Sequence, residues 1–161
     1  MDLDLGTTLI GAVSVLLCVT PFVLVTRSVK KKEKAMLRSL SNFAEQDNCK
    51  IHEHEYVGDF IIGMDTNKSA VFFYKEEKDA TEKLSVNLKD VKNCKVSKIG
   101  KSVRNHGKVE QTIERIELIF NTSPSASKDV VFELFNYQNN LQLNGELQTA
   151  EKWANKVNAI V

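Results

Sequence analysis

A stretch near the N-terminus places the strongest constraint on what this chain can fold into. From Leu5 to Val25 the sequence contains no Asp, Glu, Lys, Arg or His. As an α-helix this stretch would be roughly 30 Å long, because each residue adds about 1.5 Å, and that length matches the hydrocarbon core of a bilayer. Pro21 lies near its end, where the loss of one helical hydrogen bond disturbs the helix least. We therefore predict a transmembrane helix over residues 5–26, preceded by a short segment at residues 1–4.

Charges on the two sides of this stretch indicate how it is oriented. Asp2 and Asp4 precede it, and five cations follow it: Arg27, Lys30, Lys31, Lys32 and Lys34. A cleaved signal peptide carries positive charge before its apolar part and a small-residue cleavage site after it, so the pattern here favours an uncleaved anchor. Because Lys and Arg beside a span stay in the cytoplasm, we expect the N-terminus outside and the globular domain in the cytoplasm. The five cations are also candidate contacts for anionic lipid.

Small residues line one face of the predicted span. Thr7, Gly11, Ser14 and Cys18 recur at intervals of four, three and four, which places them together on a helix. Small side chains let two helices approach closely, so one interpretation is a homodimer that pairs through this face. The other is the ordinary background of small residues in transmembrane helices.

Residues 27–48 form a linker that begins basic and becomes amphipathic. Its apolar residues recur at three- and four-residue spacing, which predicts a helix: they are Met36, Leu37, Leu40, Phe43 and Ala44. One interpretation is a helix that lies on the membrane with its apolar face inserted. The other, which we favour, is that the stripe packs on the globular domain or on a partner helix.

The remainder, residues 49–161, is long enough for one domain with its own core. Apolar residues alternate with polar ones in several segments, which predicts strands around 60–64, 69–75, 84–88, 91–99, 110–120 and 130–137. A helix is predicted over about 147–161, with Trp153 at the centre of its apolar stripe. Short connections favour antiparallel pairing, so the expected class is α+β, with the final helix covering the open core of the strands.

Cysteine usage agrees with a reducing compartment. Three cysteines, Cys18, Cys49 and Cys94, are widely spaced and contain no CxxC pair, which argues against a disulfide framework. A bridge between Cys49 and Cys94 is the alternative to two reduced thiols. In a cytoplasmic domain the sequons at Asn67 and Asn121 would be chance matches.

The order of the predicted elements, the turn DTNK at 65–68 and the terminal helix around AEKWANKV resemble the pleckstrin-homology-like superfold, in particular the small bacterial PH-type domains. The resemblance covers residues 50–161. It implies a six- to seven-stranded barrel or sandwich capped by the C-terminal helix, and it implies no enzyme activity. Relatives that bind phosphoinositides use cations in and after the first strand loop, where this chain offers only Lys68 and Lys75.

Two clusters are candidate binding sites. His52 and His54 would share one face of a strand near Cys49, so a metal-dependent activity there is a weaker hypothesis. Between Lys89 and Lys108 seven cations accompany a single acid, Asp90, which suggests contact with anionic lipid. That segment has no aromatic residue on which bases could stack, so no nucleic-acid partner is expected.

No catalytic motif or phosphate-binding glycine loop is present, so we expect no enzyme activity, no cofactor and no catalytic residue. The hypothesis that remains is a membrane-anchored module that binds a protein partner, and the alternative is sensing of an anionic lipid surface.

Overall fold

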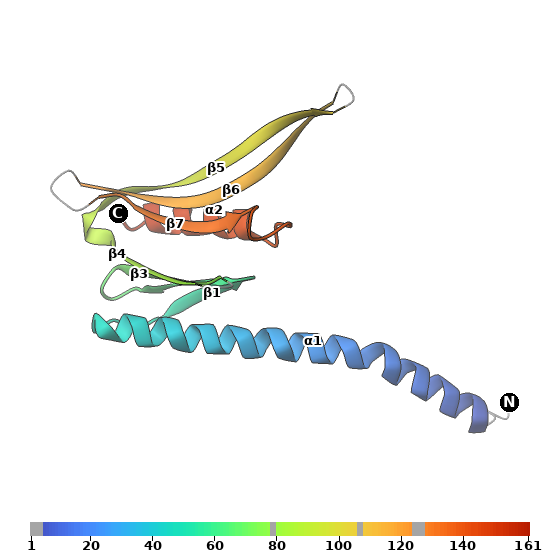
Figure 1. Ribbon diagram of the computed structural model, residues 1–161. Helices are drawn as coiled ribbons and strands as arrows, with labels where there is room; N and C mark the ends of the chain where they lie inside the picture. Colours follow the sequence, from blue (N-terminus) through green and yellow to red (C-terminus); the bar gives the residue numbers. More distant parts are fainter. Residues whose placement is uncertain (1–4, 78–79, 106–107, 124–127) are drawn as a thin grey trace. The chain divides into compact units, whose positions relative to one another are not determined.

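The computed structural model describes residues 5–77, 80–105, 108–123 and 128–161, and the side chains of residues 5–12, 22–23 and 102–111 lie outside that description. The chain divides into two compact units, Met1–Ala35 and Met36–Val161. The expected α+β class is confirmed: an N-terminal apolar helix is followed by two antiparallel sheets and a C-terminal helix (Figure 1).

Helix α1 runs without interruption from Leu5 to Gln46 and contains Pro21. The expected transmembrane segment and the expected linker helix are therefore parts of one helix. From Val13 onward α1 is long and apolar enough to cross a membrane, and the apolar part of this stretch is exposed. Because the helix continues to Gln46, Pro21 lies in its interior and not near its end, and its missing N–H removes one hydrogen bond of α1.

The seven strands form two meanders in which consecutive strands are neighbours. The first sheet contains β1 (Glu53–Val57), β2 (Phe60–Asp65), β3 (Ala70–Glu76) and β4 (Thr81–Asn87). After the 3-10 turn η1 (Leu88–Asp90), the second sheet contains β5 (Val91–Asn105), β6 (Lys108–Thr122) and β7 (Val130–Asn136). Helix α2 (Glu146–Asn158) ends the fold. The expected segments all contain strands, and β1 is an additional strand before them.

The main core lies between the two sheets and α2. Phe73 of the first sheet stacks on Phe132 of the second, with ring centroids 4.9 Å apart, and Phe132 also contacts Phe120 at 4.7 Å. Trp153 is only 2% exposed within the same cluster. The prediction that α2 covers the open core around Trp153 is therefore confirmed.

The outer face of the first sheet is buried as well, and α1 covers it. Met36, Leu40 and Ala44 are fully buried against Ile61 and other residues of the sheet, namely Phe72 and Tyr74. The apolar stripe of the linker thus packs on the globular domain. The C-terminal helix covers only one side of the strands, because β2 and β3 are apolar on both faces and each face needs its own cover.

A buried glycine allows α1 to lie this close to the sheet. A Cβ atom added to Gly63 would stand 2.9 Å from Leu40 Cδ2 and 2.9 Å from Ile51 Cγ2. Both distances are inside van der Waals contact, so a larger residue at position 63 would displace the Leu40 and Ile51 side chains.

Helix α2 is fixed to β1 by one carboxylate. Glu55 accepts hydrogen bonds from Thr149 Oγ1 at 3.2 Å, Lys152 Nζ at 2.9 Å and Trp153 Nε1 at 3.1 Å. Partial burial alone would raise the pKa of Glu55, but the charge and hydrogen bond of Lys152, with the other two donors, outweigh it and hold that pKa below its ordinary value of 4.5.

We expect Glu55→Gln to lower the free energy of unfolding by about 1 kcal/mol at neutral pH, because the amide keeps the shape and loses the charge. The lowered pKa stabilises the folded state above pH 4.5, and this contribution disappears as the pH falls through the folded-state pKa. The difference between wild type and variant should therefore vanish in acid. Urea unfolding at a series of pH values measures it, with the exposed Glu45→Gln as the matched control. A difference that does not change with pH would contradict the assignment.

Candidate functional site

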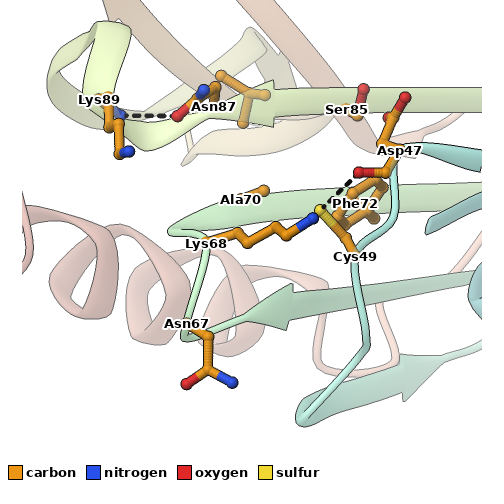
Figure 2. A pocket seen from close by; sticks show the side chains of 10 residues that line it. Asp47, Cys49, Asn67, Lys68, Ala70, Phe72, Ser85, Asn87 and Lys89 are labelled. Atoms are coloured by element: carbon orange, nitrogen blue, oxygen red, sulfur yellow. Dashed lines mark hydrogen bonds between the residues drawn. The ribbon is translucent and has the colours of Figure 1, made fainter. Parts of the chain in front are cut away.

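A pocket of about 470 Å³ opens on the outer side of the first sheet, beside the C-terminal end of α1 (Figure 2). Three segments contribute to it: the chain that leaves α1, the β2–β3 turn, and the end of β4 with η1. Its lining residues are Asp47, Cys49, Asn67, Lys68, Ala70, Phe72, Ser85, Val86, Asn87 and Lys89. The pocket therefore has an apolar floor on β3 and a polar rim that contains two lysines.

The first wall forms where α1 ends. Asn48 adopts a left-handed conformation, with φ 55°, which is a common way for a helix to end. The turn is closed by the Cys49 N–H, which donates to the Ala44 carbonyl at 2.9 Å. It directs the Cys49 thiol toward the pocket, with its Sγ 3.6 Å from the Asp47 carbonyl oxygen. Burial raises the pKa of Cys49, so the thiol stays protonated at neutral pH and is a weak nucleophile.

The second wall is the β2–β3 turn, which one buried carboxylate holds in shape. Asp65 accepts hydrogen bonds from the backbone N–H groups of Lys50, Asn67 and Lys68 at 2.8, 2.9 and 3.1 Å. Burial alone would raise the pKa of Asp65, but these three donors outweigh it and lower that pKa. The turn positions Lys68, whose side chain extends toward Cys49 (Figure 2). Its Nζ donates to the Asn48 carbonyl.

The third wall is the end of β4. Ser85 lies opposite Phe72 in the register of β3 and β4, and Asn87 lies opposite Ala70. The Asn87 side chain accepts a hydrogen bond from the Lys89 N–H at 3.1 Å, which caps η1 and fixes the backbone that carries Lys89. The rim of the pocket thus contains two lysines, Lys68 and Lys89, and one carboxylate, Asp47. The site therefore suits a ligand that carries a negative charge and an apolar group.

A second pocket, of about 390 Å³, is acidic. It lies where the β1–β2 turn and the β3–β4 hairpin meet the residues after β7, and its acidic lining residues are Asp59, Glu76 and Glu77. Asn140 donates to Asp59 at 2.8 Å, and Asn139 donates to Glu77 at 3.0 Å. These contacts hold the segment after β7 against the first sheet, so we regard this pocket as a structural junction.

Lys75 belongs to the neighbourhood of that junction and is 1% exposed. Its Nζ lies 3.1 Å from Glu77 and 3.4 Å from Glu133. Of the two lysines that the resemblance offered for a lipid headgroup, Lys75 is therefore paired within the domain. The β-branched and aromatic residues that precede Lys75 in the sequence do not indicate that it pairs with Glu133 of the other sheet.

The histidines of the metal hypothesis do not gather a third ligand. His52 precedes β1, and its Nδ1 lies 3.4 Å from Asp65 Oδ1, while its Nε2 lies 3.4 Å from the Asn67 amide nitrogen. Across residues 5–77, 80–105, 108–123 and 128–161, no group of three His, Cys, Asp or Glu side chains is arranged to hold a metal ion. Cys49 and Cys94 are both free and belong to different clusters, so the alternative of a disulfide between them is wrong.

The two predicted cationic surfaces, one on α1 and one on β5, differ in their surroundings. On α1 the residues Arg27, Lys30, Lys31, Lys32 and Lys34 are all exposed. On β5, Lys98 is 2.9 Å from Glu151 and Lys101 is 2.6 Å from Glu114, so part of the Lys89–Lys108 charge is neutralised internally. The side chains of Arg104 and Lys108 lie outside the described residues, as do those of Thr7 and Gly11 on the predicted pairing face. Ser14 and Cys18 of that face are exposed.

No protein-family model, no curated protein and no solved structure matches this chain. A function is therefore inferred below from the geometry of the molecule.

Proposed function

We propose that this protein is a membrane-tethered interaction module. The apolar part of α1 anchors it in a bilayer, and the unit Met36–Val161 presents the pocket beside β4 to a protein partner at the membrane surface. The observation that carries the proposal is the continuity of α1: one helix contains the apolar segment and also supplies Met36, Leu40 and Ala44 to the domain core. Tethering raises the local concentration for partners on the same membrane.

The orientation that we propose places the domain in the cytoplasm and the N-terminus outside. The cations that follow the apolar segment support it, because Lys and Arg beside a span are retained on the cytoplasmic side. The free cysteines Cys49 and Cys94 agree with a reducing compartment.

We further propose that the domain is PH-like. The order of the elements supports this proposal. A four-stranded meander is followed by a three-stranded meander and by a C-terminal helix that packs on the core between them, as this superfold implies. A fold alone does not specify a function, so the proposal of binding without catalysis rests on the site. The site supports it because its one thiol, Cys49, has a raised pKa and lies in a wall of the pocket.

Sensing of an anionic lipid surface is the second candidate, and one observation favours it. Five exposed cations of α1 follow the apolar segment directly, and each contributes about 1 kcal/mol near a negatively charged leaflet. This attraction would strengthen attachment of the anchor. The cations of β5 support it less, because Lys98 and Lys101 already pair with acids of the domain.

The proposal is tested by site-specific photo-cross-linking on native membranes. A photo-reactive residue at Asn87, on the pocket rim, is expected to form a discrete protein adduct, whereas one at the exposed Val131 of β7 is not. Replacing residues 5–26 by an unrelated transmembrane helix should preserve the adduct. Removing them should reduce it at least tenfold at equal protein concentration, because the effective concentration is lost. Equal adducts without the anchor, or adducts to lipid alone, would contradict the proposal.

A further inference from the structure

We propose that the free edge of β4, together with the pocket beside it, docks an extended acidic segment of a partner protein by strand addition. The inference rests on the proposed function, since it specifies which part of the domain the partner contacts and which chemistry it brings. Such a segment would pair its backbone with β4 and direct alternate side chains toward the pocket.

The phase of the hydrogen bonds shows which backbone groups β4 leaves available. The Leu88 N–H donates to the Ser69 carbonyl and the Glu77 N–H donates to the Ala80 carbonyl, each at 2.8 Å. In an antiparallel pair, hydrogen-bonded positions alternate with positions whose N–H and C=O point away from the partner strand. The two bonds above show that Ala80 and Leu88 occupy hydrogen-bonded positions, so the even-numbered residues of β4 bond to β3. The odd-numbered residues point their backbone N–H and C=O groups away from β3, and they are Thr81, Lys83, Ser85 and Asn87.

These groups lie on an open edge. β4 is the last strand of its sheet, and Thr81, Lys83, Ser85 and Asn87 are all exposed. Proteins usually block such an edge with charged side chains, proline, a bulge or a covering element, and β4 carries Glu82 and Lys83. The edge of β5 carries such a cover, because the Asn158 side chain accepts from the Cys94 N–H and donates to the Cys94 carbonyl, both at 2.8 Å. β4 contains no proline, and its pairing with β3 runs without a register shift.

The side chains at this edge indicate the chemistry of the segment. The four residues with outward backbone groups share the outer face of the sheet, and two of them, Ser85 and Asn87, line the pocket. An added strand would therefore place alternate side chains beside Ser85 and Asn87, at the open side of the pocket. The pocket lining contains two lysines, Lys68 and Lys89, and one carboxylate, Asp47. On β4 itself, Lys83 shares the outer face and lies over the Tyr74 ring, 5.8 Å from its centroid. An Asp or Glu at alternate positions would pair with these lysines, and an apolar residue among them would contact the floor.

The test begins with the whole protein in nanodiscs of uncharged phosphatidylcholine and a display library of random octapeptides. We expect selection of peptides with Asp or Glu at alternate positions. A selected peptide is then resynthesised with a single N-methyl group at each residue in turn. Strand addition requires every second amide of the peptide, so affinity should fall about tenfold at alternate residues and stay unchanged at the others.

Two matched variants test the edge from the side of the protein. Ser85→Pro removes an outward N–H and keeps the hydrogen bonds to β3, a position where edge strands tolerate proline. It should weaken binding of the selected peptide about tenfold, whereas Ser85→Ala, which keeps the N–H, should not. Lys68→Glu with Lys89→Glu should weaken binding and remove most of its salt dependence. The midpoint of thermal unfolding identifies a misfolded variant, and the N-methyl series does not depend on any variant.

Each contrary outcome is informative. Equal binding by Ser85→Pro and Ser85→Ala, or N-methyl effects without a period of two, would overturn strand addition. Selection of peptides without acids, or binding only to vesicles that contain phosphatidylserine, would overturn the assigned chemistry. If cross-linkers on β7 or α2 capture a membrane protein while the β4 edge captures none, this inference fails and the proposed function stands.

Discussion

A fragment that begins at residue 49 is expected to unfold or aggregate where a fragment that begins at residue 33 stays folded. The longer fragment keeps Met36, Leu40 and Ala44, which are fully buried on the outer face of the first sheet. Burying a side chain such as Leu or Met contributes about 1.5–3 kcal/mol, so the segment contributes roughly 5 kcal/mol in all. That is comparable to the whole stability of a small domain. Urea unfolding followed by circular dichroism, with light scattering for aggregation, measures the difference.

Point variants of the longer fragment separate this packing from a general effect of length. Leu40→Asp introduces a carboxylate at a fully buried position and should unfold the domain, whereas Asn42→Asp adds the same charge at an exposed position of the same helix. If the fragment from residue 49 is as stable as the longer one, α1 does not form part of the domain core.

Phe132→Ala is expected to lower the free energy of unfolding by about 3–5 kcal/mol. Phe132 is fully buried, stacks on Phe73 across the two sheets and contacts Phe120 within its own. Truncation leaves a cavity in the centre of the core, and the facing rings belong to different sheets that do not readily move together to fill it. Equilibrium unfolding of the fragment from residue 33 measures the change.

The neighbouring Val131 supplies the control, because it is 39% exposed and lies on the same strand. Val131→Ala should change stability by less than about 1 kcal/mol. A similar loss for both variants would mean that the second sheet responds to strand propensity and not to packing against the first.

The strands and the terminal helix were predictable from the sequence because each has one buried and one exposed face. Ile116, Leu118 and Phe120 are fully buried at every second position of β6, and Trp153 lies in the buried stripe of α2. Strand β1 was considered only as a possible carrier of the histidine pair, because its five residues, EHEYV, are exposed or only partly buried and show no apolar alternation. The continuous run in β3 indicates a strand covered on both faces, but nothing in its own sequence identifies α1 as the second cover.

The pocket was harder to predict. It forms where residues after α1, a turn and an edge strand meet, and none of these segments has the spacing of a ligand-binding motif. Lys68 was singled out from its turn, but its position beside Lys89 follows only from the pairing of β3 with β4. Lys75, singled out by the same reasoning, is buried beside Glu77 and Glu133. The sequence could not predict this, because it does not show which acids lie near a lysine in space.

The contact between Gly63 and Leu40 links the evolution of two distant positions. A methyl group at residue 63 would require the Leu40 side chain to shift or to be smaller, so a change at position 63 depends on the residue at position 40. In a lineage descended from this chain, a substitution at 63 should therefore accompany or follow one at 40. The last turns of α1 would then diverge at the pace of the domain core, and not at the faster pace usual for a linker.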